Sequence, residues 1–270
     1  MTATTTVSAG PGSVATRDAG PPRGVAGWVR GYLLMLRFDL SSQRQWLPFG
    51  VIMQVLLGAG MAIIYGFYAP HLPRAGLLYL VTGAPAVALI PFGMLAVPML
   101  VTQARVAGTF DFVWSLPVPR SAQMASTLTV CSLIAVPGIV LTLVLAAWRY
   151  GVPLSISPMV VPAFLLTALM AASVGLAMAH LIGNPMIVNL ITNILVFVVL
   201  LYSPISFPLS QFPAWLGDIH QGLPLYHMGV VIRSSLTTGL VSNVGTSYLV
   251  LGAWTVAALL GVSWVVGRRK

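Results

Sequence analysis

Residues 124–148 read MASTLTVCSLIAVPGIVLTLVLAAW, a stretch without one charged side chain. At a rise of about 1.5 Å per residue, a helix of this length exceeds the roughly 30 Å of a bilayer's hydrocarbon core. Because an unpaired strand would leave its amides without partners in lipid, we predict a transmembrane helix here. Other uncharged segments of spanning length share this character, which predicts an all-α integral membrane protein with six transmembrane helices: 46–68, 78–102, 124–148, 159–182, 186–207 and 247–267.

The composition of the whole chain leads to the same class. Of its 270 residues, 58% are hydrophobic and 6% are charged, Glu is absent, and the mean hydropathy is +0.95. A soluble domain carries roughly a quarter charged residues, so a soluble enzyme is excluded. Cys131 is the only cysteine and lies in an apolar run, which indicates a small buried side chain rather than a disulfide or a thiolate metal site.

A basic pattern precedes the first predicted span, in residues 25–45. Four arginines recur every seven residues and share one sector of a helix: Arg23, Arg30, Arg37 and Arg44. Apolar side chains fall broadly opposite: Val25, Trp28, Tyr32, Met35 and Leu36. We predict an amphipathic interfacial helix in the headgroup plane, with packing on the protein's own cytoplasmic surface as the alternative. Asp39 interrupts the apolar face.

The distribution of basic residues predicts the orientation. Six spans place both termini on one side, where ten of the 13 Lys and Arg residues fall, against three on the other. The positive-inside rule then puts the N- and C-termini, including a disordered tail at residues 1–24, in the cytoplasm. The arginines flank hydrophobic runs, which suits anionic membrane lipids and excludes nucleic acid as a partner. Arg-, Ala-, Gly- and Pro-rich usage indicates a bacterial cytoplasmic membrane.

Several predicted spans contain prolines that bend a helix, or small or polar residues that share one helix face. Prolines should interrupt and bend two of them, as hinges or as packing adaptations: Pro85, Pro91 and Pro98 in the second span, and Pro137 in the third. A small-residue face in the fourth span predicts close contact within the subunit: Ala171, Gly175 and Ala179. Asn189 and Asn193 share a face of the fifth span, which predicts either helix packing or a cavity.

The sequence lacks the residue patterns that a catalytic site would need. The four Asp residues lie outside the spans, so no paired-carboxylate site is available in the membrane. A phosphate loop needs a lysine after its glycines, and the only lysine is Lys270, so we expect no ATP hydrolysis, cofactor or metal in this chain. His220 and His227 are interpreted as loop histidines, and His180 alone lies near a span end, so ion-coupled transport is poorly supported. Any energy that drives this chain must therefore be supplied by another polypeptide.

The predicted cytoplasmic loop 103–123 begins QARVAGTFDFVWSLPVPR. Thr109 is predicted to cap a short helix that Pro117 ends, with Asp111 near its positive end. Three apolar side chains of this helix suit a groove on a soluble partner: Phe110, Val113 and Trp114.

The predicted external loop, 208–246, follows a Pro-rich segment, and residues 203–219 read SPISFPLSQFPAWLGDI. Four apolar side chains fall at i, i+3, i+4 and i+7, an apolar stripe suited to the outer membrane interface: Phe212, Trp215, Leu216 and Ile219. We therefore predict a membrane-proximal external helix.

These two segments, in this order and placement, resemble the membrane subunits of type 2 ABC transporters over residues 25–270. That family's cytoplasmic loop has an R-x-x-G-T-x-E-x-L-x-x-x-P-v-x-R type pattern, with matches in kind here: Arg105, Gly108, Thr109, Asp111, Leu116, Pro117, Val118 and Arg120. Asp111 stands where Glu is usual, and Ala104 and Ala107 stand where acidic residues are frequent, which implies a weaker or displaced ionic contact. The family's external segment resembles 203–219 followed by Leu223–Tyr226 and Arg233.

The resemblance implies the permease subunit of an ATP-driven exporter for an amphipathic small molecule, drug-like or lipid-like. Its implied partners are two cytoplasmic ATPase subunits, which hold ATP and Mg, and a second permease chain, identical or related. The coupling helix would be 110–116, within a set that contacts the ATPase: Arg105, Gly108, Thr109, Phe110, Asp111, Trp114, Leu116, Pro117 and Arg120. The translocation path would pass Pro91, Phe92, Met94, Asn189 and Asn193.

Two other function classes stay open at this point. The first is a membrane anchor that recruits a cytoplasmic ATPase and transports nothing. The second, a lipid-modifying membrane enzyme, is weakened by the missing acid/base groups.

Overall fold

The computed structural model describes residues 24–268 apart from 69–72, 152–153, 203, 206–207 and 210–211. The predicted disordered tail therefore lies outside the described residues except for Gly24. The described elements are all helices, which confirms the all-α class. They are α1 (Val25–Gln43), α2 (Leu47–Tyr68), α3 (Arg74–Pro91), the π-helix η2 (Phe92–Ala96), α4 (Val97–Val106), α5 (Thr109–Ser115), α6 (Arg120–Tyr150), α7 (Val160–Leu181), α8 (Pro185–Tyr202), α9 (Ala214–Gly222), α10 (Pro224–Leu236) and α11 (Val244–Arg268).

Within this part of the chain, five helical stretches are long and apolar enough to cross a membrane: Leu47–Ile64, Arg74–Val106, Arg120–Tyr150, Val160–Leu181 and Val244–Arg268. The predicted span 186–207 corresponds to α8, which is apolar but shorter over Pro185–Val199. The number of six spans therefore stays a prediction.

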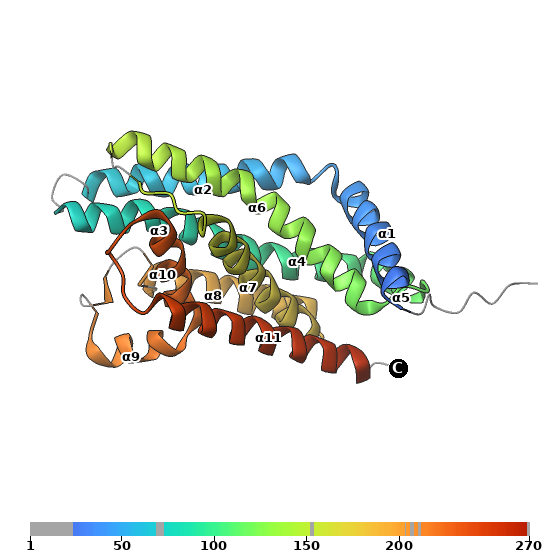
Figure 1. The fold of residues 1–270 in the computed structure, drawn as a ribbon. Coiled ribbons are helices and arrows are strands. Elements are labelled where there is room, and N and C mark those ends of the chain that lie inside the picture. Colours follow the sequence, from blue (N-terminus) through green and yellow to red (C-terminus); the bar gives the residue numbers. More distant parts are fainter. Residues whose placement is uncertain are drawn as a thin grey trace, which may run out of the picture.

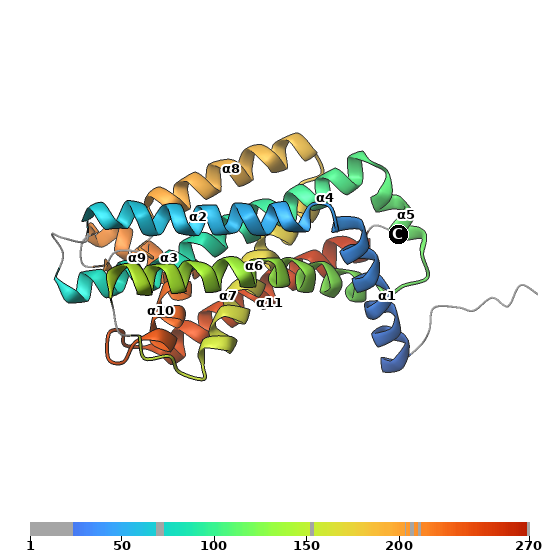
Figure 2. The same cartoon turned by 90° about the horizontal axis from the view of Figure 1, so that it is seen from above.

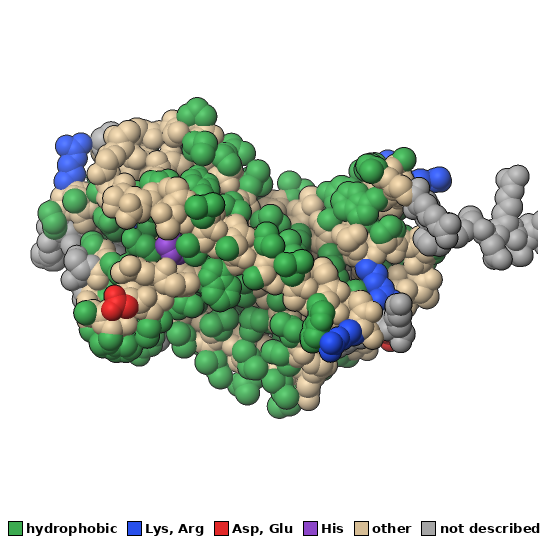
Figure 3. All heavy atoms as spheres, turned by 60° about the horizontal axis from the view of Figure 1, so that its bottom comes forward, with side chains coloured by type: hydrophobic (Ala, Val, Ile, Leu, Met, Phe, Trp, Pro, Cys, Tyr) green, Lys and Arg blue, Asp and Glu red, His purple; other side chains and the backbone are tan. Residues whose placement is uncertain are grey.

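The long helices run lengthwise between two distinct ends of the molecule (Figure 1). α1, α5 and the C-terminal end of α11 lie at one end, and α9 and α10 lie at the other. α1 is turned away from the direction of α2 and crosses that end, as the view from above shows (Figure 2). Hydrophobic side chains cover much of the surface between the ends, and basic side chains gather toward them (Figure 3).

Prolines disturb the second span less than predicted. The helix continues past Pro91, widens into η2 and resumes as α4 as far as Val106. α6 also runs through Pro137 without a break, so the predicted interruption there is wrong. In membranes, local π adjustments and neighbouring helices satisfy the backbone groups that proline frees.

The predicted small-residue face of α7 packs inside the subunit, as expected. Gly175 lies against η2 and α4, so close that a Cβ there would be 2.4 Å from the carbonyl oxygen of Gly93. On the facing side, a Cβ at Gly93 would be 2.5 Å from the Cβ of Ala171. These contacts fix the π-helix of the second span against α7.

α1 packs along α6 and is held there by side chains. Trp28 Nε1 donates to Ser121 Oγ at 2.9 Å, and the Tyr32 hydroxyl donates to Thr129 Oγ1 at 3.0 Å. Gly31 makes the close approach possible, because a Cβ there would lie 3.2 Å from the side chains of Val118 and Pro119. This agrees with the alternative in which the helix packs on the chain's own surface.

The outward face of α1 is nevertheless apolar in part. Val25 is 81% exposed, and Leu33 and Leu34 are each 50% exposed, whereas Met35 is buried. Of the apolar residues predicted for one face, Val25 is exposed, Met35 is buried, and Trp28, Tyr32 and Leu36 are half-buried, so that face packs mainly on the protein. Leu33 and Leu34 lie outside the predicted face. Exposed leucines on a helix at this end remain suited to a membrane surface.

Candidate functional site

α5 begins at a glycine in a left-handed conformation. Gly108 occupies the N-cap position with φ 72°, and no side chain caps the helix, so the predicted capping role of Thr109 is wrong. A left-handed residue at this corner suits glycine, which has no Cβ to clash. At the other end Leu116 is extended and is followed by Pro117, so the predicted helix end is correct to one residue.

The predicted docking stripe of α5 faces the chain itself. The rings of Phe110 and Trp114 stack with centroids 4.9 Å apart, and Val113 is buried. Phe110 and Trp114 pack against a core cluster that includes Val101 and Leu176. We therefore correct the prediction that this stripe offers its apolar surface to a soluble partner: residues at i, i+3 and i+4 share one face, and here that face is used for packing.

The opposite face of α5 is exposed. It presents Asp111, Phe112 and Ser115, and the Phe112 side chain is 58% exposed. A carboxylate and an aromatic ring one residue apart form the surface that a partner at this end would meet. The sequence pattern concealed Phe112, because it lies outside the apolar stripe.

Two arginines hold α5 at its two ends. The Arg105 guanidinium lies 5.0 Å from the ring centroid of Phe110, and its Nη1 donates to the Ile182 carbonyl oxygen at 3.4 Å. The Arg120 guanidinium lies 4.5 Å from the ring centroid of Trp114, and its Nη1 donates to the carbonyl oxygen of Val266. α5 is thereby attached to the end of α7 and to the end of α11.

His180 lies beneath α5 near the end of α7. The side chain is 5% exposed, its Nδ1 is 2.9 Å from the Leu176 carbonyl oxygen, and its ring centroid is 6.0 Å from that of Phe110. The residue picked out as the one ionisable group near a span end is thus part of the packing under α5.

Asp39 is a functional candidate that the sequence pattern had marked only as a disturbance. Its Oδ2 accepts a hydrogen bond from Ser126 Oγ at 2.6 Å and a longer one from Thr127 Oγ1 at 3.5 Å. Burial raises the pKa of the Asp39 carboxyl above its ordinary value, and the two hydroxyls oppose that shift. No local signal in the sequence marks this contact, because Ser126 and Thr127 lie on another helix 87 and 88 positions away.

The residues predicted for a translocation path do not share one surface. Met94 is buried in the helix core, whereas Asn189 and Asn193 lie on an exposed face of α8. The Asn193 amide donates to the Asn189 carbonyl oxygen at 2.7 Å. The side chains of Pro91 and Phe92 lie outside the described part of the chain.

The predicted external stripe is present in part. Trp215 and Ile219 are 65% and 52% exposed on α9, whereas Leu216 is half-buried. Phe212 precedes the start of the helix, and its ring centroid lies 6.2 Å from that of His220. Trp215 and Ile219 are thus the members of the stripe available to a membrane surface.

Arg233 on α10 is a buried cation. The side chain is 1% exposed, and its guanidinium lies 3.9 Å from the ring centroid of Tyr79. Nε donates to Thr82 Oγ1 at 3.2 Å, and Nη2 donates to the carbonyl oxygen of Ile205. The arginine therefore ties α10 to α3 and to the segment after α8, whereas the sequence had placed it in the external loop, as the arginine that closes the family-like segment.

A comparison with families of known proteins gives one match that covers most of the chain. The family described as ABC-2 type transporter matches residues 30–237. The matched region extends from α1 to the end of α10 and contains α5 with both arginines that hold it. A search of curated proteins finds no match.

Proposed function

The chain belongs to the ABC-2 type transporter family and is the transmembrane part of an ABC transporter, and from this premise we propose that it is the permease subunit of an exporter. The proposed cargo is an amphipathic small molecule, drug-like or lipid-like. The proposed partners are two cytoplasmic ATPase subunits, which bind ATP and Mg, and a second permease chain. The proposed location is a bacterial cytoplasmic membrane with both termini inside.

The observation that carries the proposal is the two-sided character of α5. Its inner face is packed on the bundle and its ends are held by Arg105 and Arg120, whereas Asp111 and Phe112 face outward. A partner that pushes on the outer face would move a helix that is firmly attached to the membrane domain. Such an attachment is what mechanical coupling to an ATPase requires.

The proposed motion has a route into the membrane. α5 follows directly on α4, and α4 continues the π-helix η2 in the second span. π-helical turns are frequent at functional sites, where they allow a helix to change its local register. The close contact of Gly93 with Ala171 on α7 would pass a shift of η2 to a second helix.

The exposed face of α8 supports a second permease chain. Asn189 and Asn193 lie there beside the exposed side chains of Leu190, Ile194 and Phe197. Side-chain amides facing lipid are costly, and they favour helix contacts or a water-lined cavity. We propose that α8 faces the second permease chain, with the path for the cargo along the same boundary.

Coupling is tested by measuring ATP hydrolysis and export together in a reconstituted complex with the ATPase. We expect Asp111→Arg and Phe112→Ala to lower both activities by tenfold or more, because both side chains lie on the outer face of α5. The matched controls are Asp218→Arg and Phe67→Ala, which change exposed residues outside α5. Equal losses in the controls, or full coupling in the α5 variants, would refute the docking role.

The same complex separates a transporter from an anchor. An exporter should hydrolyse ATP faster when its cargo is added, whereas an anchor would bind the ATPase with no response to any cargo.

The α8 boundary is tested by cross-linking, since Cys131 is the only native cysteine. In a Cys131→Ser background, Asn193→Cys should give cross-linked permease pairs in membranes. Leu260→Cys, 63% exposed on α11, should not. Cross-linking from position 260 but not from position 193 would place the boundary elsewhere.

A further inference from the structure

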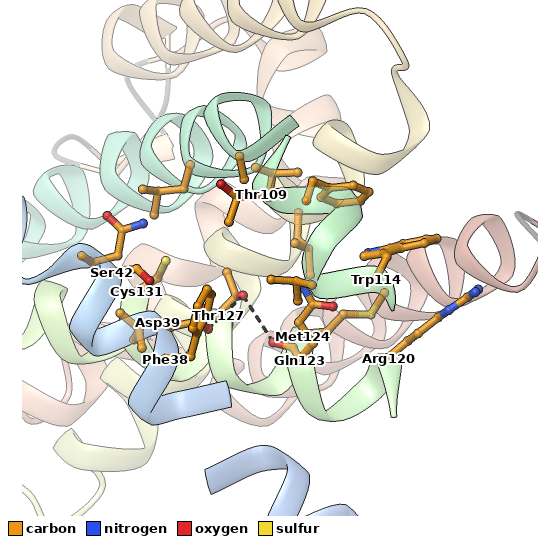
Figure 4. Close-up of a pocket in the computed structure, with 18 of the residues that line it drawn as sticks. Phe38, Asp39, Ser42, Thr109, Trp114, Arg120, Gln123, Met124, Thr127 and Cys131 are labelled. Carbon is orange, nitrogen blue, oxygen red and sulfur yellow. Dashed lines mark hydrogen bonds between the residues drawn. The ribbon is translucent and has the colours of Figure 1, made fainter. Parts of the chain in front are cut away.

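A cavity of about 130 Å³ lies between α5 and the helices that surround it (Figure 4). Its lining comes from α1, α4, α5, α6 and α7. An engineered cavity of about 150 Å³ in another protein holds benzene, so the space suits a group of that size.

The lining combines one carboxylate with aromatic rings. Asp39 contributes the carboxylate, and Phe38, Phe110 and Trp114 contribute the rings. Asp39 accepts hydrogen bonds from the hydroxyls of Ser126 and Thr127, and within the described residues no cation forms an ion pair with it. A partly buried carboxylate with neutral partners is energetically unfavourable and is stabilised by a positive ligand.

Two basic side chains of the lining, Arg120 and His180, have other partners, and His180 Nδ1 is 2.9 Å from the Leu176 carbonyl oxygen. Arg120 lies across the cavity from Asp39 (Figure 4). Its guanidinium lies over the ring of Trp114, and its Nη1 donates to the Val266 carbonyl oxygen. The negative side of the cavity therefore remains open to a cation brought by a ligand. Aromatic faces add to the binding of organic ammonium groups through cation–π attraction.

We propose that this cavity is a binding site for a small organic cation, with its ammonium group beside Asp39 and its apolar part against Phe110 and Trp114. A bound cation would contact the inner face of α5, whose outer face carries Asp111 and Phe112. This proposal rests on the cavity and not on the proposed transport function, so its test needs no ATPase.

The probe is benzyltrimethylammonium, which carries one aromatic ring and one fixed positive charge. Binding is measured with the radiolabelled probe on the purified full chain in phosphatidylglycerol nanodiscs. Neopentylbenzene, the neutral carbon isostere, is the competitor that tests the charge. We expect saturable binding of the cation and competition at least tenfold weaker from the neutral isostere, because only the cation is attracted to the Asp39 carboxylate and to the faces of the aromatic rings.

Two variants locate the site. Asp39→Asn should weaken binding by tenfold or more, whereas Asp218→Asn, which removes an exposed charge on α9, should leave it unchanged. Ala104→Phe fills the cavity from α4 without touching Asp39 and should also abolish binding. Thermal unfolding establishes whether each variant is folded. If Asp39→Asn does not fold, binding to Ala104→Phe decides whether the cavity is the site.

Three results would overturn the proposal: no saturable binding to the unmodified chain, equal competition by the neutral isostere, or undiminished binding to Ala104→Phe. A further competition experiment identifies the natural source of the cation. Competition from phosphatidylethanolamine added to the nanodiscs would assign the site to a lipid headgroup, and no competition would assign it to a soluble amine.

Discussion

Gly175 is the residue at which α7 approaches the π-helix of the second span most closely. A Cβ at this position would lie 2.4 Å from the backbone carbonyl oxygen of Gly93 and 3.0 Å from Cδ of Pro98, whereas ordinary contact begins at 3.4 Å. A backbone oxygen cannot rotate away, so the two helices must separate by about 1 Å. Overpacking of this kind costs typically 1–3 kcal/mol, and we expect Gly175→Ala to lower the free energy of unfolding by about that amount.

The measurement is unfolding of the purified chain in detergent, followed by helical circular dichroism during titration with a denaturing detergent. The control is Gly252→Ala on α11, where an added Cβ would meet nothing within 4 Å. There alanine removes backbone freedom and should be neutral or stabilising by about 0.5–1 kcal/mol. If both variants unfold at the same point, the close contact is absent and the reasoning about η2 and α7 fails.

Three other perturbations have defined outcomes. Arg233→Ala should destabilise the chain by about 3 kcal/mol or more, because it leaves a cavity and the unpaired Ile205 carbonyl; unfolding in detergent measures this, and an unchanged midpoint contradicts it. Gly108→Ala should cost about 1 kcal/mol in the same assay, since φ is 72° there, and a gain in stability would count against the left-handed corner. The raised pKa of Asp39 means that its carboxyl stabilises the fold most below pH 3.8 and that this contribution is lost as pH rises through the folded-state pKa. The melting temperature relative to Asp39→Asn should therefore fall as pH rises above about 4, and a difference that rises would contradict the shift.

Helix positions could be predicted from the sequence because lipid imposes one simple requirement on the chain. A long uncharged run must form a helix to satisfy its own backbone, so the ends of α2 and α7 fall within one residue of their predicted positions. α6 begins earlier, at Arg120, because a helix continues beyond the apolar core into the polar region where its hydrogen bonds still form.

Which side of each helix is buried could not be predicted in the same way. Lipid is as apolar as a protein core, so hydrophobicity does not distinguish an inward side chain from an outward one. The buried Met94 and the exposed Ile194 illustrate this, because both are apolar side chains in predicted spans yet only one of them faces inward. Gly175 was informative, since small size rather than polarity marks close packing in membranes.

The polar interactions at the α5 end were the hardest to predict. Asp39 and Ser126 are 87 positions apart in the chain, and nothing in either local pattern indicates that they meet. Trp114 illustrates the opposite case, because its helix was predicted correctly but the face that it shares with Phe110 was assigned to a partner instead of to the chain's own core.

α11 is one continuous helix, Val244–Arg268, that joins the two ends of the molecule by a route separate from the second span (Figure 1). At one end its Val266 carbonyl receives Arg120, beside α5, and at the other Ser247 Oγ lies 2.9 Å from Nδ1 of His227 on α10. Trp254 adds a hydrogen bond at 3.1 Å to the last residue of α9, Gly222. Hydrogen bonds at both ends of one continuous helix therefore link the α5 end of the molecule to α9 and α10 at the opposite end.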